Sequence, residues 1–138
     1  MKLKTEHKKA IVEEFAFVAK RMRETEPVDQ KMFYFSGTFL LLSRVFNSEF
    51  HSQLAMAHLI MTTAHTNILA RINAIKGGDN TIMLQNEFFE KLTLAVEEFA
   101  DRVKKDRDIY DVVEKIALLT YVTTGNGYYL LQKGLFSL

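Results

Sequence analysis

The sequence predicts an all-α fold, a helical bundle of about five helices. Apolar residues recur every three or four positions over long segments, which is the period of an amphipathic helix. Pro27 is the single proline, so the chain contains few helix breakers. No segment shows the alternation of apolar and polar residues typical of a β-strand. A chain of 138 residues is expected to form one domain, residues 1–138, around one hydrophobic core.

The first two helices are separated by Pro27. The first is expected over residues 5–25. One of its faces carries the apolar stripe Ile11, Val12, Phe15, Val18 and Met22. It ends before Pro27, because the residue that precedes a proline avoids the helical region. The second helix is expected over residues 28–46, and Asn47 then indicates a turn, with Ser48 as the N-cap of the next helix.

Glycines and an aspartate bound the remaining three helices. The third is expected over residues 49–76, because Gly77 and Gly78 end it. The fourth is expected over residues 81–105, with one apolar and one acidic face. Asp108 is the predicted N-cap of the fifth helix, which extends to about residue 133, just before Gly134.

Charged residues are distributed unevenly among these helices. Residues 52–70 and residues 116–132 contain no Asp, Glu, Lys or Arg. A helix without charged residues has no obvious face for solvent. We therefore expect the second, third and fifth helices at the centre of the bundle and the charged first and fourth helices at its periphery. The architecture would be a four-helix core with an additional N-terminal helix.

A short internal repeat is compatible with a duplicated αα-hairpin. Residues 43–45 (Ser-Arg-Val) resemble residues 101–103 (Asp-Arg-Val), and residues 61–63 (Met-Thr-Thr) resemble residues 122–124 (Val-Thr-Thr). Both matches are separated by about 60 residues. The second and third helices would then correspond to the fourth and fifth.

Composition excludes several classes of function. The balance of 18 basic and 17 acidic residues gives no electrostatic footprint for nucleic acid. No cysteine is present, which excludes disulfides, thiol catalysis and cysteine-ligated zinc. The charged N-terminal residues do not resemble a secretory signal, and residues 52–70 are too polar for a membrane span. We expect a cytoplasmic protein without membrane contact.

Three histidines, His51, His58 and His65, are spaced seven residues apart and are expected to share one helical face. Seven residues span about 10.5 Å of helix axis, so one helix cannot bring two of these rings to one metal ion. We predict no metal site and no cofactor. Imidazoles hydrogen-bonded at the edge of the apolar stripe are the favoured interpretation. A metal or catalytic role and a pH-sensitive contact are the alternatives.

Small and polar residues gather near the midpoints of the second, third and fifth helices. The favoured interpretation is close packing of helices at small residues. The alternatives are a kink at Gly125 or Gly127 and a polar pocket that holds a ligand. The candidate ligand-binding residues of that pocket are His58, Thr62, His65, Asn67, Thr123 and Asn126.

The apolar surface of the charge-free helices exceeds what the first and fourth helices can cover, so we expect a homodimer or a higher homo-oligomer. Its candidate interface residues are Tyr121, Tyr128 and Phe136, with the C-terminal Leu138 beside them. Phosphate-binding loops, nucleophile elbows and zinc-protease motifs are absent. The sequence therefore favours a non-catalytic protein that acts through protein–protein interaction or regulation. A small-molecule-binding bundle, with or without enzymatic activity, is the alternative.

Overall fold

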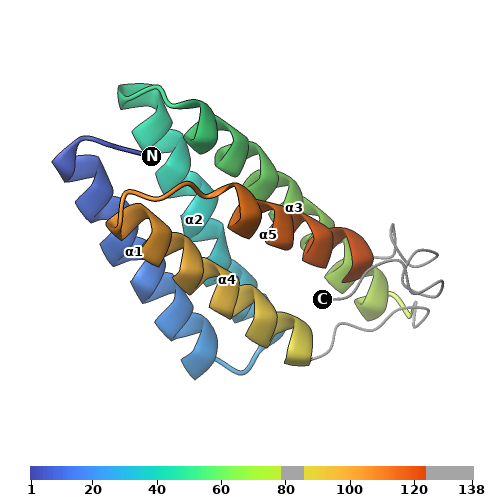
Figure 1. The fold of residues 1–138 in the computed structure, drawn as a ribbon. Helices are drawn as coiled ribbons and strands as arrows, with labels where there is room; N and C mark the ends of the chain where they lie inside the picture. Colours follow the sequence, from blue (N-terminus) through green and yellow to red (C-terminus); the bar gives the residue numbers. More distant parts are fainter. Residues whose placement is uncertain (79–85, 124–138) are drawn as a thin grey trace.

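The computed structural model describes the backbone of residues 1–78 and 86–123, and the side chains of residues 1–78 and 87–120. The described residues form five α-helices: α1 (Thr5–Glu24), α2 (Val28–Ser48), α3 (Ser52–Lys76), α4 (Asn86–Lys104) and α5 (Tyr110–Thr123). Successive helices run antiparallel (Figure 1). The predicted all-α bundle is confirmed. Within these ranges, no helix has both the length and the apolar character that crossing a membrane requires.

The five helices form a ring in which each helix packs against two neighbours. Around the ring the order is α1, α2, α3, α5 and α4, so that α4 returns to α1 and closes the bundle (Figure 1). Each helix therefore directs one stripe of side chains inward and leaves another outside. The inward stripes of all five helices form one hydrophobic core.

The contact between α1 and α4 provides two of the three largest fully buried side chains, Phe15 and Phe99, and α2 provides the third, Phe35. The Phe15 and Phe99 rings are stacked with their centroids 4.6 Å apart, and neither residue is accessible to solvent. Ile11 and Met22 on α1 and Leu92 on α4 are equally buried. These helices show the clearest separation of apolar and charged residues in the sequence, which explains why they form this pair.

The expected division into central and peripheral helices is not observed. Helix α3, expected at the centre, exposes Leu59, Thr63 and Thr66 to solvent. Helix α1, expected at the periphery, lies between α2 and α4. The prediction was wrong because the absence of charge does not measure burial. Threonine hydroxyls on α3 are hydrogen-bonded to the helix itself, so the helix needs no charged residue on its outer side.

The junction between α2 and α3 also differs from the prediction. Helix α2 continues through Ser48, and the break falls at Glu49, whose backbone is extended. Helix α3 begins at Ser52, and its N-cap is His51 rather than Ser48: the His51 Nδ1 accepts a hydrogen bond from the Gln53 amide at 3.1 Å. His51 therefore lies outside the helix and does not share a helical face with the other two histidines.

Helix α4 ends in a Schellman motif that contains no glycine. Asp106 has a φ of 55°, in the left-handed region that glycine usually occupies. The Arg107 amide donates to the Arg102 carbonyl at 2.9 Å, and the Asp106 amide donates to the Val103 carbonyl at 3.2 Å. Helix α5 then begins at Tyr110, later than the predicted N-cap at Asp108 would place it.

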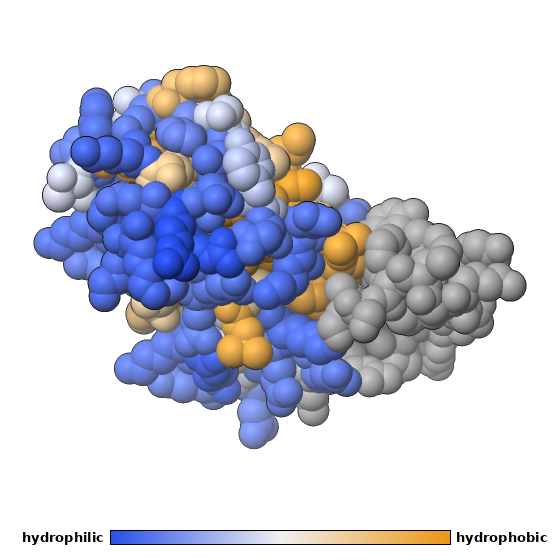
Figure 2. Space-filling model, viewed as in Figure 1, coloured by the Kyte–Doolittle hydropathy of each residue, from blue (hydrophilic) through white to orange (hydrophobic). Residues whose placement is uncertain are grey.

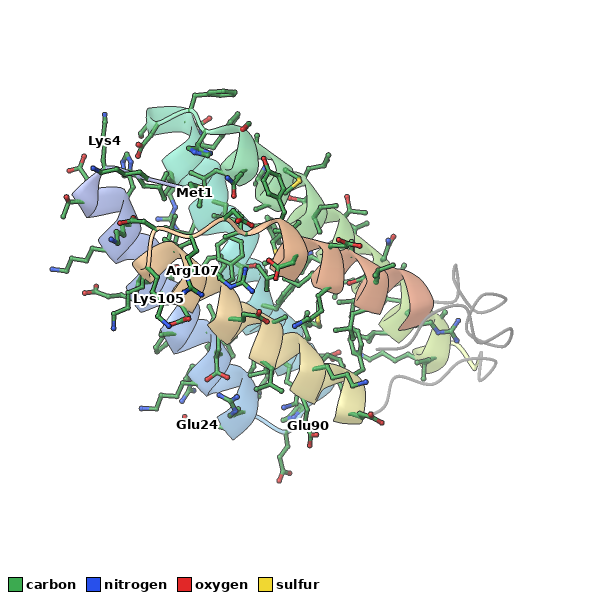
Figure 3. The ribbon with its side chains drawn as sticks, in the orientation of Figure 1. Met1, Lys4, Glu24, Glu90, Lys105 and Arg107 are labelled. Carbon is green, nitrogen blue, oxygen red and sulfur yellow. The ribbon has the colours of Figure 1, made fainter. Side chains whose placement is uncertain are left out.

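The first eight residues connect two junctions at one end of the bundle. Glu49 accepts hydrogen bonds from the Lys4 amide at 3.0 Å and pairs with the His7 Nδ1 at 2.7 Å. Lys8 contacts the Asp106 carboxylate at 3.2 Å, and the Met1 amine donates to the Asp106 carbonyl at 3.0 Å. Met1 accordingly lies beside Lys105 and Arg107 in Figure 3. This segment ties the α2–α3 junction to the α4–α5 turn.

We expect Phe99→Ala to lower the free energy of unfolding by about 3 to 5 kcal/mol, because it removes a buried ring and leaves a cavity. Leu94→Ala on the same helix is the control. Leu94 is 58% exposed, so the control should change stability by less than about 0.5 kcal/mol. Urea unfolding followed by circular dichroism measures both. Equal effects of the two substitutions would contradict the packing of α1 against α4.

A second prediction concerns Glu49, whose pKa lies below its ordinary value chiefly because of the hydrogen bond with His7. A lowered carboxyl pKa stabilises the fold above the unfolded value near 4.5, and this stability is lost as the pH falls through the folded pKa. Glu49→Gln should therefore lower the free energy of unfolding at pH 7 by about 1 to 2 kcal/mol and weaken its dependence on pH below 4.5.

The control for this measurement is Glu13→Gln. Glu13 is 68% exposed on α1, and its distance to Lys9 is 4.0 Å. An exposed pair of this kind contributes little to stability. Urea unfolding across the acid range should separate the two variants. If Glu49→Gln keeps the acid dependence of the wild type, Glu49 does not hold the N-terminal segment.

Candidate functional site

The outer side of the α2–α3 hairpin is a surface without charged residues. We call it the α2–α3 face, formed by Phe33, Ser36, Leu40, Ser43, His58, Leu59, Thr62 and Thr66. Its large apolar residues are well exposed: Phe33 by 71%, Leu40 by 51% and Leu59 by 64%. The face follows from two segments of the sequence, residues 32–43 and 52–70, that contain no charged side chain.

Three hydroxyl groups of this face, those of Ser36, Thr62 and Thr66, are hydrogen-bonded within their own helices. The Ser36 hydroxyl donates to the Phe33 carbonyl at 2.5 Å. The Thr62 and Thr66 hydroxyls donate to the carbonyls four residues earlier at 2.8 and 3.0 Å. A hydroxyl that already donates its hydrogen bond to a backbone carbonyl needs no acceptor from water. The face is therefore less polar than its sequence composition indicates.

The opposite side of the bundle is charged and connected by ion pairs. Arg102 on α4 makes two parallel hydrogen bonds to the Asp111 carboxylate on α5, at 2.5 and 2.7 Å, and a third to Glu98 at 3.0 Å. This contact raises the pKa of Arg102 and lowers that of Asp111. Arg23 pairs with Glu97 between α1 and α4. Figure 2 shows that the surface over α1 and α4 is mostly hydrophilic.

Charged residues occur only where the α2–α3 face ends. At one end, Lys76 on α3 pairs with the Asp29 Oδ2 on α2 at 2.6 Å. Towards the other end, Arg44 on α2 is exposed, and among the described residues no carboxylate lies within ion-pair distance of it. The face thus has one acidic residue and one basic residue of α2 at its two ends.

An aromatic cluster borders the face on the side of α1. The ring of Tyr34 makes edge contacts with Phe33 at 5.4 Å and with Phe17 at 6.3 Å. Arg21 donates to the Tyr34 hydroxyl at 2.9 Å, which raises the pKa of its guanidinium. Phe17 is 54% exposed. Tyrosine, phenylalanine and arginine are the residue types enriched at protein interfaces.

The structure places the predicted ligand-binding residues of α3 on two different sides of that helix. The His65 ring lies against Phe39 of α2, with the ring centroids 4.9 Å apart. Asn67 instead lines a groove of about 320 Å³ between α3 and α5, with Thr63 and Leu118. Helices α2 and α5 do not pack against each other. Because the side chains of Thr123 and Asn126 lie outside the described residues, the pocket between helices 2, 3 and 5 stays a prediction.

Several predicted residues fall beyond what the structure describes. The backbone of Tyr121 and Thr123 belongs to α5, but their side chains lie outside the described residues. Asn126, Tyr128, Phe136 and Leu138 lie wholly outside them. Within the described part of the chain, no group of three or more His, Cys, Asp or Glu side chains is arranged to hold a metal ion.

Sequence reasoning missed the exposed residues of α2. Phe33 and Leu40 are seven residues apart, so they share one helical face. The sequence signal for this face is that the small residues Ser36 and Gly37 lie midway between the large residues Phe33 and Leu40.

No protein-family model matches this chain, and no characterised protein or solved structure is significantly similar to it. Its function is therefore argued from the chemistry of its surface.

Burial gives His65 a testable property, because it lowers the pKa of the imidazole below the ordinary value of 6.5. The unfolded chain then binds the proton first, so stability falls as the pH drops below 6.5 until the folded pKa is reached. His65→Phe keeps a ring against Phe39 but cannot ionise. We expect it to reduce the loss of unfolding free energy as the pH falls below 6.5.

Urea unfolding at a series of pH values measures this effect. Thr66→Ser is the control, because it changes the neighbouring residue without altering any titratable group. An unchanged acid limb in His65→Phe would mean that His65 is fully solvated in the folded chain.

Proposed function

We propose that this chain is a non-catalytic protein that acts by binding other protein chains, beginning with copies of itself, through the α2–α3 face. The observation that carries the proposal is the exposure of Phe33, Leu40 and Leu59, by 71%, 51% and 64%, on a surface without charge. Clustered, exposed apolar side chains on a folded domain are typical of interaction sites.

Three further properties of the face support binding to protein. The hydroxyls of Ser36, Thr62 and Thr66 are hydrogen-bonded internally, so covering them leaves no donor unpaired. Phe17 and Tyr34 extend it with aromatic area, which contributes strongly to protein interfaces. Its charged residues lie at the ends, as in interfaces with an apolar centre and a polar rim.

The remaining expectations belong to the same proposal. A cytoplasmic location agrees with a chain that contains no cysteine. Protein partners are favoured over nucleic acid because basic and acidic residues are balanced over the whole chain.

Self-association is the most direct test. Light scattering of the purified chain at micromolar concentration should give at least twice the mass of one chain. The double variant Phe33→Glu/Leu59→Glu should give the mass of one chain, because it places buried negative charges in the interface. Both residues are exposed in the bundle, so its unfolding free energy should change by less than about 1 kcal/mol.

The matched control is Leu94→Glu on α4. Leu94 is 58% exposed, and its helix lies on the charged side of the bundle. This variant should keep the mass of the wild type. A wild-type protein with the mass of one chain at all concentrations would refute self-association, and loss of association in the control would place the interface elsewhere.

The α3–α5 groove supports a second candidate function, the binding of a small apolar molecule. A volume of about 320 Å³ lies within the range of ligand sites, and Asn67 and Thr63 provide polar groups among Ile60, Ala64 and Leu118. Ala117→Phe would fill this groove. If the groove binds ligand, the variant should lose the thermal stabilisation that a bound apolar molecule gives, without a change in oligomeric mass.

A further inference from the structure

We propose that the occupant of the α2–α3 face is a second copy of this chain whose α2 runs antiparallel to the first. The twofold axis crosses α2 at the bond between Ser36 and Gly37. This inference rests on the proposed function and specifies the geometry of its first assembly. It is argued from the positions of four outward residues on α2: Asp29, Phe33, Leu40 and Arg44.

These four residues are arranged symmetrically along one stripe of the helix. Residues 33 and 40 are centred on the bond between residues 36 and 37, and so are residues 29 and 44. At 3.6 residues per turn, all four fall within about 60° of one another around the helix axis. All four are exposed. A stripe of this symmetry can meet its own copy in the antiparallel direction.

A twofold interface brings residue i against residue j of the other copy, and residue j against residue i. With the axis between Ser36 and Gly37, Phe33 meets the partner's Leu40, and Leu40 meets the partner's Phe33. The apolar residues are thereby matched twice. The small residues lie at the centre, where the two helices approach most closely.

Charge selects the antiparallel orientation. In this arrangement Arg44 lies beside the partner's Asp29. Within its own chain that carboxylate is bound by Lys76 through Oδ2, and no described residue donates a hydrogen bond to its Oδ1. In a parallel arrangement, Arg44 would lie beside the partner's Arg44, and two like charges would repel at the edge of an apolar contact. The two charged residues of this stripe therefore favour one direction of docking over the other.

Gly37 is explained by the same contact. Glycine is less favourable than alanine inside a helix. A Cβ at this position would lie 3.5 Å from the Val18 Cγ2 and 3.9 Å from the Glu14 Oε1, both ordinary contact distances. The packing of α1 against α2 therefore does not require a glycine. A small residue at the centre of the stripe allows the backbone of a second helix to approach closely from outside.

Disulfide cross-linking tests this register directly, since the chain contains no cysteine of its own. Phe33→Cys and Leu40→Cys are purified separately and then oxidised, alone and as an equimolar mixture. In the mixture the two cysteines lie at the same height on facing helices. In either variant alone, equivalent positions are about 10.5 Å apart along the axis, beyond the reach of a disulfide. The mixture should cross-link at least about tenfold faster than either variant alone.

Ser36→Cys provides a second measurement that keeps both apolar residues. It lies next to the axis, so this variant alone should form a disulfide-linked dimer. Leu94→Cys, on the charged side of the bundle, should not. Leu59→Cys tests a contact centred on α3 instead, and preferential cross-linking there would overturn the proposal.

A charge reversal tests the orientation. Arg44→Glu should raise the dimer dissociation constant by about tenfold at low salt, because it creates two repulsive contacts with Asp29 of the partner subunit. Adding Asp29→Arg to this variant should restore most of the affinity. Lys20→Glu, on an exposed site of α1, is the control and should have little effect.

The outcomes separate this inference from the proposed function. A dimeric mass with cross-linking through Phe33→Cys, Leu40→Cys and Ser36→Cys supports both. A dimeric mass without that pattern, or without rescue by the charge exchange, overturns the antiparallel register and leaves self-association standing. The mass of one chain at every concentration overturns both.

Discussion

The contact between α1 and α4 is the constraint on which the rest of the bundle depends. Sequential antiparallel packing alone would give an open row of helices. Stacking of Phe15 on Phe99 instead places α4 against α1, and α5 packs between α4 and α3, so the helices form a ring. Once the ring is closed, each helix has two neighbours and one outer stripe. The exposed position of the α2–α3 face is a consequence of this closure.

Ion pairs and apolar residues then divide the outer surface into two parts. The outer stripes of α1, α4 and α5 contain pairs such as Arg102 with Asp111, which stay hydrated. The outer stripes of α2 and α3 contain Phe33, Leu40 and Leu59 with hydroxyls bonded to their own helices. Charged residues in the first part favour contact with water, whereas the apolar side chains of the second part are stabilised when a partner removes them from water. This difference is the physical basis for assigning interaction to one side of the bundle.

Local signals predicted much of the fold. Pro27 marks a helix end because proline restricts the backbone, and Gly77 marks another because glycine leaves the backbone free to change direction. The end of α2 was not predictable in this way. Its break at Glu49 is stabilised by His7 and the Lys4 amide, more than 40 residues earlier in the chain. The end of α4 agrees with the predicted boundary near residue 105, but its stop signal is Asp106, an aspartate in the left-handed conformation that pairs with Lys8.

The candidate site was less predictable than the fold. The sequence pointed to the segments that form it, including Thr62 and His58, but assigned them to the interior. Whether an uncharged helix is buried depends on how many neighbours the topology provides, and a ring of five provides only two to each helix. Hydropathy alone cannot distinguish a stripe that meets its own core from a stripe that meets another surface.

Closure of the helix ring through α1 and α4 also affects how the chain folds while it is being synthesised. Phe99 follows Phe15 by 84 residues. At a synthesis rate of about 5 to 20 residues per second, roughly 4 to 17 s pass between the synthesis of Phe15 and that of Phe99, whose side chain covers it. During that interval α2 can shield only one flank of α1. The nascent chain therefore carries an uncovered apolar stripe on α1, and chaperones have time to act before α4 arrives.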